Sequence, residues 1–183
     1  MNHWLKYALA ASMAALCTVQ VAQAEGAYGG VGLGMFEMDP GKNKKTGLGA
    51  QLFGGIELGP LLAIEARLAS SQSVTSARET SQINWLTAIM AKPKYDIAGN
   101  ANIYALAGVT MMNASFTSVA GRKQNKTTTA LSFGFGAELY LNYNTLIGAE
   151  WVRYATQADA AVKNISFQGL DVNAFLLNIQ MNF

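Results

Sequence analysis

The chain has 183 residues, of which 51% are hydrophobic and 13% charged, and its formal net charge is +2. This length suits one domain, and so small a net charge argues against the basic surface that nucleic acid requires, so no nucleic-acid partner is expected. Beyond the N-terminal segment no run reaches the roughly 18 apolar residues of a membrane-spanning helix, which excludes a helical anchor.

Residues 1–24 have the organisation of a secretory signal peptide. Met1–Lys6 carries positive charge, Tyr7–Leu16 is apolar, and Ala22–Ala24 offers the small residues that signal peptidase requires. We therefore expect export through the Sec pathway and cleavage of this segment, which leaves residues 25–183 as a single domain.

The mature chain would contain neither cysteine nor histidine, because Cys17 and His3 both lie in the expected signal peptide. It would have no disulfide, no thiol nucleophile and no imidazole base. Lipidation of Cys17 is not expected, since Leu16 stands where a lipoprotein has a small residue. The sequence predicts no catalytic, cofactor-binding or metal-binding residue.

Eight extended segments follow the signal peptide, and connections of alternating length separate them. The best patterned segments have a period of two residues, as strands do, and none keeps the period of an amphipathic helix. The segments are Ala27–Met38, Thr46–Leu58, Leu62–Ala69, Ile83–Tyr95, Asn102–Ser115, Thr128–Leu141, Leu146–Tyr154 and Leu170–Phe183.

The alternation gives these segments an apolar face and a polar face. In the segment 128–141, apolar side chains at odd positions alternate with Ser132, two glycines and Glu138. In the segment 46–58, the even positions are apolar or small and are expected to face outward, with Gln51 and Phe53 inward. Such faces can cross hydrocarbon, which takes about 9–11 residues of a tilted strand. In the segment 83–95 the expected outward set is Ile83, Trp85, Ile89, Ala91 and Tyr95.

The alternating lengths of the connections predict that both chain termini lie on the same side of the membrane. The short ones are Gly59–Pro60, Asp96–Ala101 and Asn142–Asn144, which are rich in turn formers. With an even strand number, short turns and both termini are expected on the periplasmic side of a membrane barrel and the long connections outside the cell. The long connections are Asp39–Lys45, Ser70–Gln82, Phe116–Thr127 and Ala155–Gly169.

These stretches resemble the small outer-membrane β-barrel superfamily typified by the eight-stranded domain of OmpA and by OmpX. The resemblance implies an all-β fold, an eight-stranded antiparallel up-and-down transmembrane β-barrel in a Gram-negative outer membrane, with no cofactor. It covers the whole mature chain and is specific for architecture rather than for activity. The stretches that carry it are Leu48–Leu58, Leu62–Leu68, Ile103–Val109, Phe133–Tyr140 and Leu146–Tyr154.

The end of the chain resembles the signature by which the barrel-assembly machinery receives outer-membrane barrels. Among the last nine residues, 175–183, apolar residues occupy every odd position and Asn or Gln occupies 178, 180 and 182. One face of this strand can lie against lipid while the other stays polar. The expected assembly signal is Phe175, Leu177, Ile179, Met181 and Phe183.

Seven charged residues are expected to face the barrel interior. Paired carboxylates could act as a glycosidase pair, but charges in a narrow lumen must be paired to offset desolvation. Since an eight-stranded barrel is just wide enough to be filled by its own side chains, a network of salt bridges that plugs the lumen is the favoured interpretation. The predicted network is Glu57, Glu65, Arg67, Lys92, Lys94, Glu138 and Glu150.

Two basic segments lie in the expected outer loops. Their lysines and arginines could contact lipopolysaccharide phosphates or an acidic host or surface partner, and the alternative is a solvated loop tip. Lipopolysaccharide and the solvated tip are about equally favoured, and outer-membrane lipids are expected partners in either case. The residues are Lys42, Lys44 and Lys45 in one segment and Arg122, Lys123 and Lys126 in the other.

Aromatic residues and one arginine are assigned to the outer wall. Arg153 has lipid-facing parity and is expected to reach toward the membrane surface. The aromatic residues are expected to form girdles at the two membrane interfaces. They are Tyr28, Trp85, Tyr95, Tyr104, Tyr143, Trp151 and Tyr154.

The sequence therefore predicts a non-enzymatic outer-membrane barrel that acts through its extracellular loops, in surface interaction, adhesion or membrane integrity. The outer-membrane enzymes of similar size that act on lipid A use a histidine, which this mature chain would lack. The alternative is a small passive channel for hydrophobic or small solutes, similar to the OmpW group. A continuous apolar lining of the lumen would favour the channel, and charged pairs would favour the plug.

Overall fold

The computed structural model describes residues 26–39, 44–76, 79–97, 99–117, 123–155 and 171–183. The expected signal peptide, Lys42 and Arg122 lie outside these described residues. Within the described part of the chain, no helix is long and apolar enough to cross a membrane.

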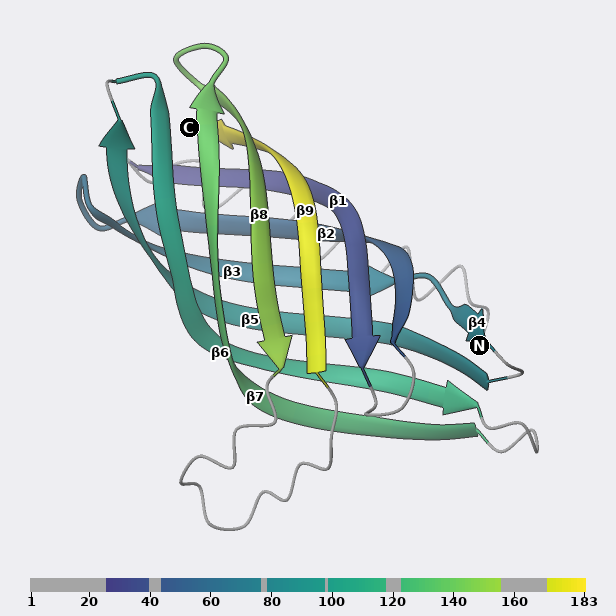
Figure 1. Cartoon of the computed structure of the whole chain (residues 1–183). Coiled ribbons are helices and arrows are strands. Elements are labelled where there is room, and N and C mark those ends of the chain that lie inside the picture. Colours follow the sequence, from purple (N-terminus) through teal and green to yellow (C-terminus); the bar gives the residue numbers. More distant parts are fainter. Residues whose placement is uncertain (1–25, 40–43, 77–78, 98, 118–122, 156–170) are drawn as a thin grey trace.

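A closed antiparallel sheet forms the molecule (Figure 1). Successive strands pair along the chain, and β1 pairs with β9. The exception among the described strands is the short strand β4, which lies between β3 and β5 in the sequence, while β3 and β5 pair directly with each other. Because β4 only extends the β5 edge, eight strands make the barrel, and the predicted fold class is confirmed. The strands are β1 (Ala27–Asp39), β2 (Lys45–Glu57), β3 (Leu62–Ser71), β4 (Val74–Ser76), β5 (Glu79–Ile97), β6 (Ala101–Thr117), β7 (Lys123–Tyr140), β8 (Thr145–Ala155) and β9 (Asp171–Asn182).

Three short turns mark one end of the barrel, which we call the turn end; we call the opposite end the loop end. The turns connect β2 to β3, β5 to β6 and β7 to β8, and β1 begins and β9 ends beside them (Figure 1). Gly99 has a φ of 74°, which favours glycine, and its amide donates to Asp96 Oδ1 at 2.6 Å. Asn142 Oδ1 accepts from the amides of Asn144 and Thr145 at 3.0 and 2.9 Å. Side-chain acceptors thus hold two of the turns in place.

At the loop end, two predicted loops are largely strand. Val74–Ser76 forms β4 and β5 begins at Glu79, so most of the segment 70–82 is hydrogen-bonded sheet. β6 continues to Thr117 and β7 begins at Lys123, which takes up most of the segment 116–127. These polar ends are rich in threonine, a strand-forming residue, so the ladder continues beyond the apolar band.

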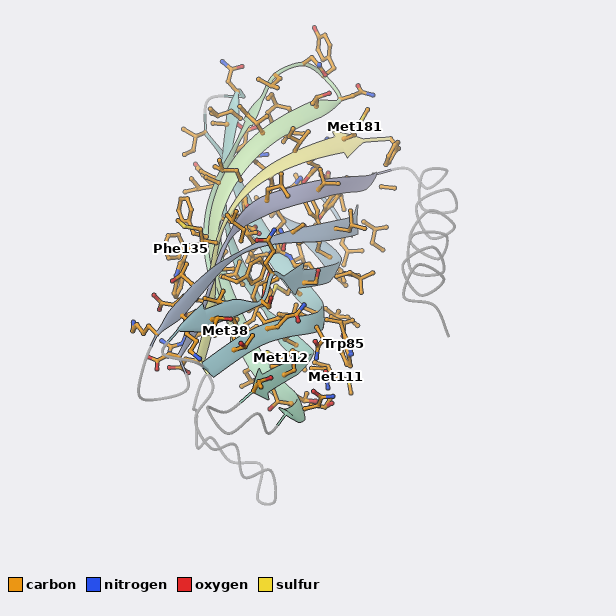
Figure 2. All side chains as sticks on the ribbon, turned by 90° about the vertical axis from the view of Figure 1, so that its right-hand side faces the viewer. Met38, Trp85, Met111, Met112, Phe135 and Met181 are labelled. Atoms are coloured by element: carbon orange, nitrogen blue, oxygen red, sulfur yellow. The ribbon has the colours of Figure 1, made fainter. Side chains whose placement is uncertain are left out.

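The outer wall is apolar, and its facing agrees with the predicted alternation in β2, β7 and β9. Leu177 is 63% exposed, whereas Gln180 on the opposite face is 5% exposed. Phe135 of β7 projects outward from the ribbon (Figure 2). The other exposed apolar residues of these strands are Leu48, Leu52, Ile56, Leu131, Phe133, Leu139, Phe175, Ile179 and Met181.

The prediction for Ile83 is wrong, because the alternation of β5 changes at a bulge. The pairing of β5 with β6 shifts between Ile83 and Trp85, so Ile83 is fully buried inside the barrel while Trp85 is 40% exposed. A β-bulge adds one residue to a strand and reverses the parity beyond it. Met90 and Lys92 resume the inward face that Leu86 begins.

Lysine at Ile179 or Phe135 should destabilise the barrel by about 2–4 kcal/mol if these side chains lie near the middle of the membrane. Urea unfolding of the variants in lipid vesicles would measure this loss. Thr129→Lys is the control, because Thr129 is exposed near the loop end of β7. Unchanged unfolding midpoints for both Ile179→Lys and Phe135→Lys would refute the assigned facing.

Candidate functional site in the barrel interior

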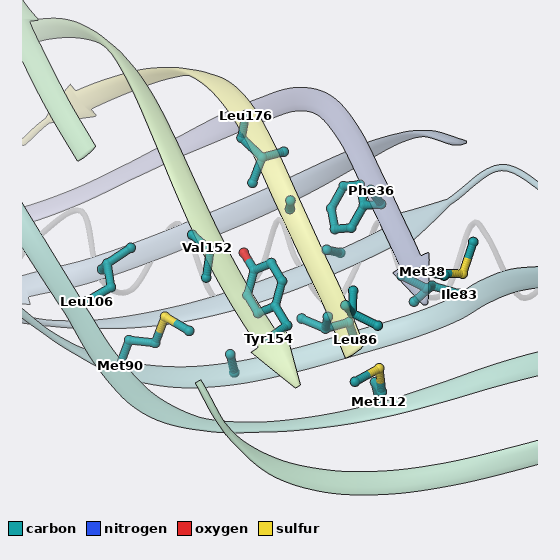
Figure 3. Close-up of a cluster of buried hydrophobic side chains, with 14 of the residues drawn as sticks. Phe36, Met38, Ile83, Leu86, Met90, Leu106, Met112, Val152, Tyr154 and Leu176 are labelled. Atoms are coloured by element: carbon teal, nitrogen blue, oxygen red, sulfur yellow. The ribbon is translucent and has the colours of Figure 1, made fainter. Parts of the chain in front are cut away.

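The barrel interior has an apolar half and a charged half. The apolar half lies toward the loop end and is a cluster of buried side chains from six strands (Figure 3). The charged half lies toward the turn end, where Tyr28, Phe53 and Ala63 add a small second cluster. The first cluster comprises Phe36, Met38, Ala69, Ile83, Leu86, Ala88, Met90, Tyr104, Leu106, Met112, Val152, Tyr154, Val172, Ala174 and Leu176.

Arg67 of β3 is the centre of the charged half. Its Nη1 and Nη2 donate to Glu150 Oε1 and Oε2 at 2.7 and 3.0 Å, which is a bidentate pair across the lumen. Its Nε donates to Glu65 Oε1 at 2.6 Å, two positions away on the same strand face. The side chains of all three residues are at most 2% exposed, so the pairing joins opposite walls of the barrel without solvent.

Lys92 of β5 forms the second centre. Its Nζ donates to Glu138 Oε2 at 2.9 Å and lies 3.8 Å from Glu65 Oε2. The same ammonium lies over the Tyr104 ring, 4.2 Å from its centroid, a cation–π contact. Lys92 thereby links Glu138 to the Arg67 group, and the buried charges form one connected network.

Glycines allow two tyrosine rings to lie flat against the wall of this network. A Cβ on Gly136 would come within 2.5 Å of Tyr104 Cζ, and one on Gly55 would meet the Tyr28 ring in the same way. Glycine at these inward positions therefore creates the room for the rings. From there Tyr104 donates to Glu150 Oε2 at 2.9 Å and Tyr28 to Glu65 Oε2 at 3.0 Å.

Neutral side chains complete the network. The Tyr154 hydroxyl accepts from Arg67 Nη1 at 3.2 Å and donates to Gln51 Oε1 at 2.8 Å, which connects the network to the apolar half. Gln51 Nε2 also donates to Glu150 Oε1 at 2.8 Å. The period-two pattern predicts that Gln51 faces inward but does not predict these hydrogen-bond partners. The remaining neutral members are Asn102, Asn178 and Gln180.

The predicted aromatic girdle is wrong for three residues. Tyr28, Tyr104 and Tyr154 are 2%, 6% and 0% exposed, because each has inward parity and a carboxylate or guanidinium partner inside. Tyr95 and Tyr143 are exposed at 64% and 97%. An aromatic residue with a hydroxyl can satisfy a charged interior as well as a membrane interface, and strand parity decides between them.

Each of the seven predicted lumen charges takes part in at least one salt bridge. Besides the five buried charges, Lys94 and Glu57 form a partly exposed pair near the turn end. A cavity of about 10 Å³ remains among the buried charges, which is about the least volume that holds one water molecule. Glu65, Glu138 and Glu150 thus carry the buried negative charge, and the two cations with the hydroxyl and amide donors offset its desolvation.

The basic residues predicted to contact lipopolysaccharide differ in exposure and in secondary structure. Lys44 is exposed and its Nζ lies 3.1 Å from Glu37 Oε1. The prediction is wrong for Lys45, which begins β2 and is 4% exposed, because its inward parity takes Nζ to Ser81 Oγ at 3.2 Å. Lys123 and Lys126 lie in β7 rather than in a loop.

Among the described residues, no group of three or more His, Cys, Asp or Glu side chains is arranged to hold a metal ion. What the described residues do form is a lipid-compatible outer wall around a lumen filled by paired charges and an apolar cluster. This combination defines a small membrane-spanning β-barrel.

The sequence matches the model of the outer membrane protein beta-barrel domain over residues 8–183. The chain therefore belongs to this family and is a protein of the Gram-negative outer membrane. A comparison with curated protein sequences finds no match. In this family the turn end is periplasmic and the loop end extracellular.

Solved structures show the same fold at low identity. Neisserial surface protein A has a TM-score of 0.68 at 12% identity, with 87% of this chain and 98% of that chain covered. Ail of Yersinia pestis has a TM-score of 0.61 at 18% identity, with 87% and 100% covered. The N-terminal barrel domain of OprF from Pseudomonas aeruginosa has a TM-score of 0.57 at 14% identity, with 88% and 100% covered.

Arg67→Gln should lower the free energy of unfolding by about 3–5 kcal/mol, because Glu65 and Glu150 would remain buried without their main cation. Adding Glu150→Gln should restore part of the loss, since one of the two carboxylates no longer needs a counter-charge. Reversible unfolding in lipid vesicles measures both effects.

The control for this cycle is Lys44→Gln, which breaks an ion pair whose lysine side chain is 64% exposed. Its effect should stay below about 1 kcal/mol. An effect of Arg67→Gln as small as that of the control would show that the network does not hold the barrel together.

Proposed function

We propose that the protein is a non-enzymatic barrel whose lumen is plugged by its own side chains and which acts at the cell surface, in surface interaction, adhesion or membrane integrity. The observation that carries the proposal is the bidentate bridge from Arg67 to Glu150 across the lumen, beside a cavity of about 10 Å³. Side chains that span the lumen and leave so small a cavity at this level support a plug rather than a channel.

The surroundings of Glu65 and Glu150 support the non-enzymatic part of the proposal. A glycosidase pair must present its two carboxyl groups to a sugar that lies between them. Here the space between Glu65 and Glu150 is occupied by the Arg67 guanidinium, and both carboxylates are fully buried. Neither group is presented to a substrate.

The basic character of the extracellular end supports an anionic surface partner. Lys44 is exposed there, and Lys42, Arg122, Lys123 and Lys126 belong to the same two segments of the sequence. Ail of Yersinia pestis has been crystallised with the heparin analogue sucrose octasulfate. We propose that these residues bind phosphate or sulfate groups, of lipopolysaccharide or of an acidic host glycan.

Serine substitution of Lys42, Lys44, Arg122, Lys123 and Lys126 together should weaken binding of immobilised heparin and of lipopolysaccharide by at least about tenfold, since charge-assisted contacts are lost. Substitution is preferable to deletion, because deleting the segment 116–127 would remove the end of β6 and the start of β7. A neutral dextran surface controls for non-specific adsorption. Unchanged binding of both polyanions would refute this part of the proposal.

A passive conduit for hydrophobic solutes is the second candidate, and the apolar half of the lumen favours it. The cluster that lines this half, which includes Met38 and Met90, is apolar, and Lys45 lies at its extracellular end, so an apolar solute that passed Lys45 could interact with the cluster. The lining is not continuous, because the network around Arg67 and Lys92 follows it toward the periplasm.

Planar-bilayer recordings separate the two candidates. The plugged barrel should give no steady conductance, with a general porin in the same bilayer as the positive control. Simultaneous Arg67→Ala, Glu150→Ala and Glu65→Ala should open water-filled space and raise the frequency of channel events, if the barrel folds as heat-modifiable migration would show. Reproducible pores from the unmodified protein would overturn the plugged lumen.

A further inference from the structure

A hollow of about 720 Å³ lies on the lipid-facing wall across β5 to β9. Two neighbouring rows of the sheet register line it. In one row Ala105 pairs with Phe135, which pairs with Trp151, which pairs with Phe175. In the other, Ile103 pairs with Ala137, which pairs with Ala149.

The two rows contain both small and large side chains. Ala105, Ala137 and Ala149 leave the sheet backbone close to the surface and form a floor. The Trp151 ring stands beside them with the Phe135 ring 5.5 Å away, and Phe175 follows on the next strand. A floor of methyl groups beside an aromatic wall forms an apolar groove that suits an extended hydrocarbon chain. We call this hollow the wall groove.

Charged and amide side chains lie immediately on the extracellular side of the wall groove. Arg153 is the next outward residue after Trp151, and Asn173 is the next outward residue before Phe175. Arg153 pairs in register with Asn173, which pairs with Glu37. We call the group Arg153, Asp171, Asn173, Glu37 and Lys44 the polar shelf.

The polar shelf contains both donors and acceptors. Arg153 Nη2 lies 2.5 Å from Asp171 Oδ2, and Glu37 Oε1 accepts from Lys44 Nζ at 3.1 Å and from Asn173 Nδ2 at 3.4 Å. Two buried polar atoms make no hydrogen bond within the described part of the chain, Arg153 Nε and Asn173 Oδ1. An unsatisfied donor and acceptor on adjacent strands indicate a ligand group that the chain does not supply.

Neutral side chains lie at the loop end of the neighbouring strands β5 to β7. There Asn84, Asn113 and Thr127 hydrogen-bond to one another at 2.6 and 2.8 Å. Among the side chains that the structure describes, the outward charges at the loop end lie on β8, β9 and β1, with Lys44 beside them.

We propose that the wall groove and the polar shelf form one binding site for a phosphorylated glycolipid of the outer leaflet, with an acyl chain in the groove and the headgroup on the shelf. Phosphate oxygens accept from Arg153 and Lys44, and sugar hydroxyls donate to Glu37, Asp171 and Asn173 Oδ1. A headgroup with both phosphate and hydroxyl groups matches this mixed surface, whereas a purely anionic headgroup would meet two carboxylates without donors. The site depends on the membrane location and not on the plugged lumen.

Native mass spectrometry of the barrel, extracted from Gram-negative outer membranes in mild detergent, tests the proposal. The double substitution Ala137→Trp and Ala149→Trp would fill the groove from the lipid side. Ala66→Trp is the matched control, because Ala66 is an exposed alanine on β3, away from the groove. The unmodified and Ala66→Trp proteins should each retain a phosphorylated glycolipid, and the doubly filled variant should lose it. Arg153→Gln should lower its affinity about tenfold through loss of a charge-assisted contact.

Four results would contradict the proposal, provided that heat-modifiable migration shows every variant folded. Glycolipid retained equally by all variants would mean that it does not use the groove. Phosphatidylethanolamine or phosphatidylglycerol retained instead would refute the headgroup assignment. A dimer that the tryptophans abolish, with no lipid bound, would assign the groove to a second copy. Binding that is unchanged by Arg153→Gln would remove the shelf from the site.

Discussion

The constraint on which this structure depends is that hydrocarbon cannot hydrogen-bond to a backbone amide. An unpaired N–H or C=O in the bilayer costs several kcal/mol, so the sheet has to close. Closure occurs where β1 pairs with β9 and where β3 pairs with β5, and both pairings depend on residues more than a strand apart in sequence. The apolar outer wall and the filled interior both follow from this closed cylinder, whose two faces meet different surroundings.

Two kinds of side-chain packing fill the interior of the barrel. In the extracellular half, apolar side chains fill the lumen much as they fill the core of a water-soluble protein. In the periplasmic half, Arg67, Lys92 and their acids fill it with ion pairs, and neutral hydroxyls and amides satisfy the remaining lone pairs. Tyr154 belongs to both halves, since its ring packs on Phe36 and its hydroxyl reaches Arg67.

Much of the fold was predictable from the period-two pattern, because lipid outside and protein inside impose alternation on each strand. Alternation could not reveal the bulge of β5, which reverses parity at Ile83 through a single inserted residue. Nor could it show that Phe36 and Met38 line an apolar half of the lumen, since apolar residues there interrupt the polar-inside pattern.

The sequence predicts which charged residues face the lumen, but it does not predict which ion pairs they form. The period-two pattern places Glu65, Arg67 and Glu150 on the inner face. The stagger between the strands decides which of these charges meet, and the stagger cannot be derived from the sequence of a single strand. The tyrosines and Lys45 were misassigned for a related reason. Residues near a strand end suit either a membrane interface or the lumen, and only the register resolves them.

The position of Glu65 on the same strand as Arg67 has a consequence for how the barrel is built. Glu150, the other partner of the guanidinium, is made 83 residues later than Arg67. Glu65 lies two residues before Arg67 on β3 and accepts from it at 2.6 Å, so this carboxylate stays close to the arginine whatever the order in which the strands join. A β3 strand that has not yet met β8 therefore does not have to bring a lone cation toward the bilayer.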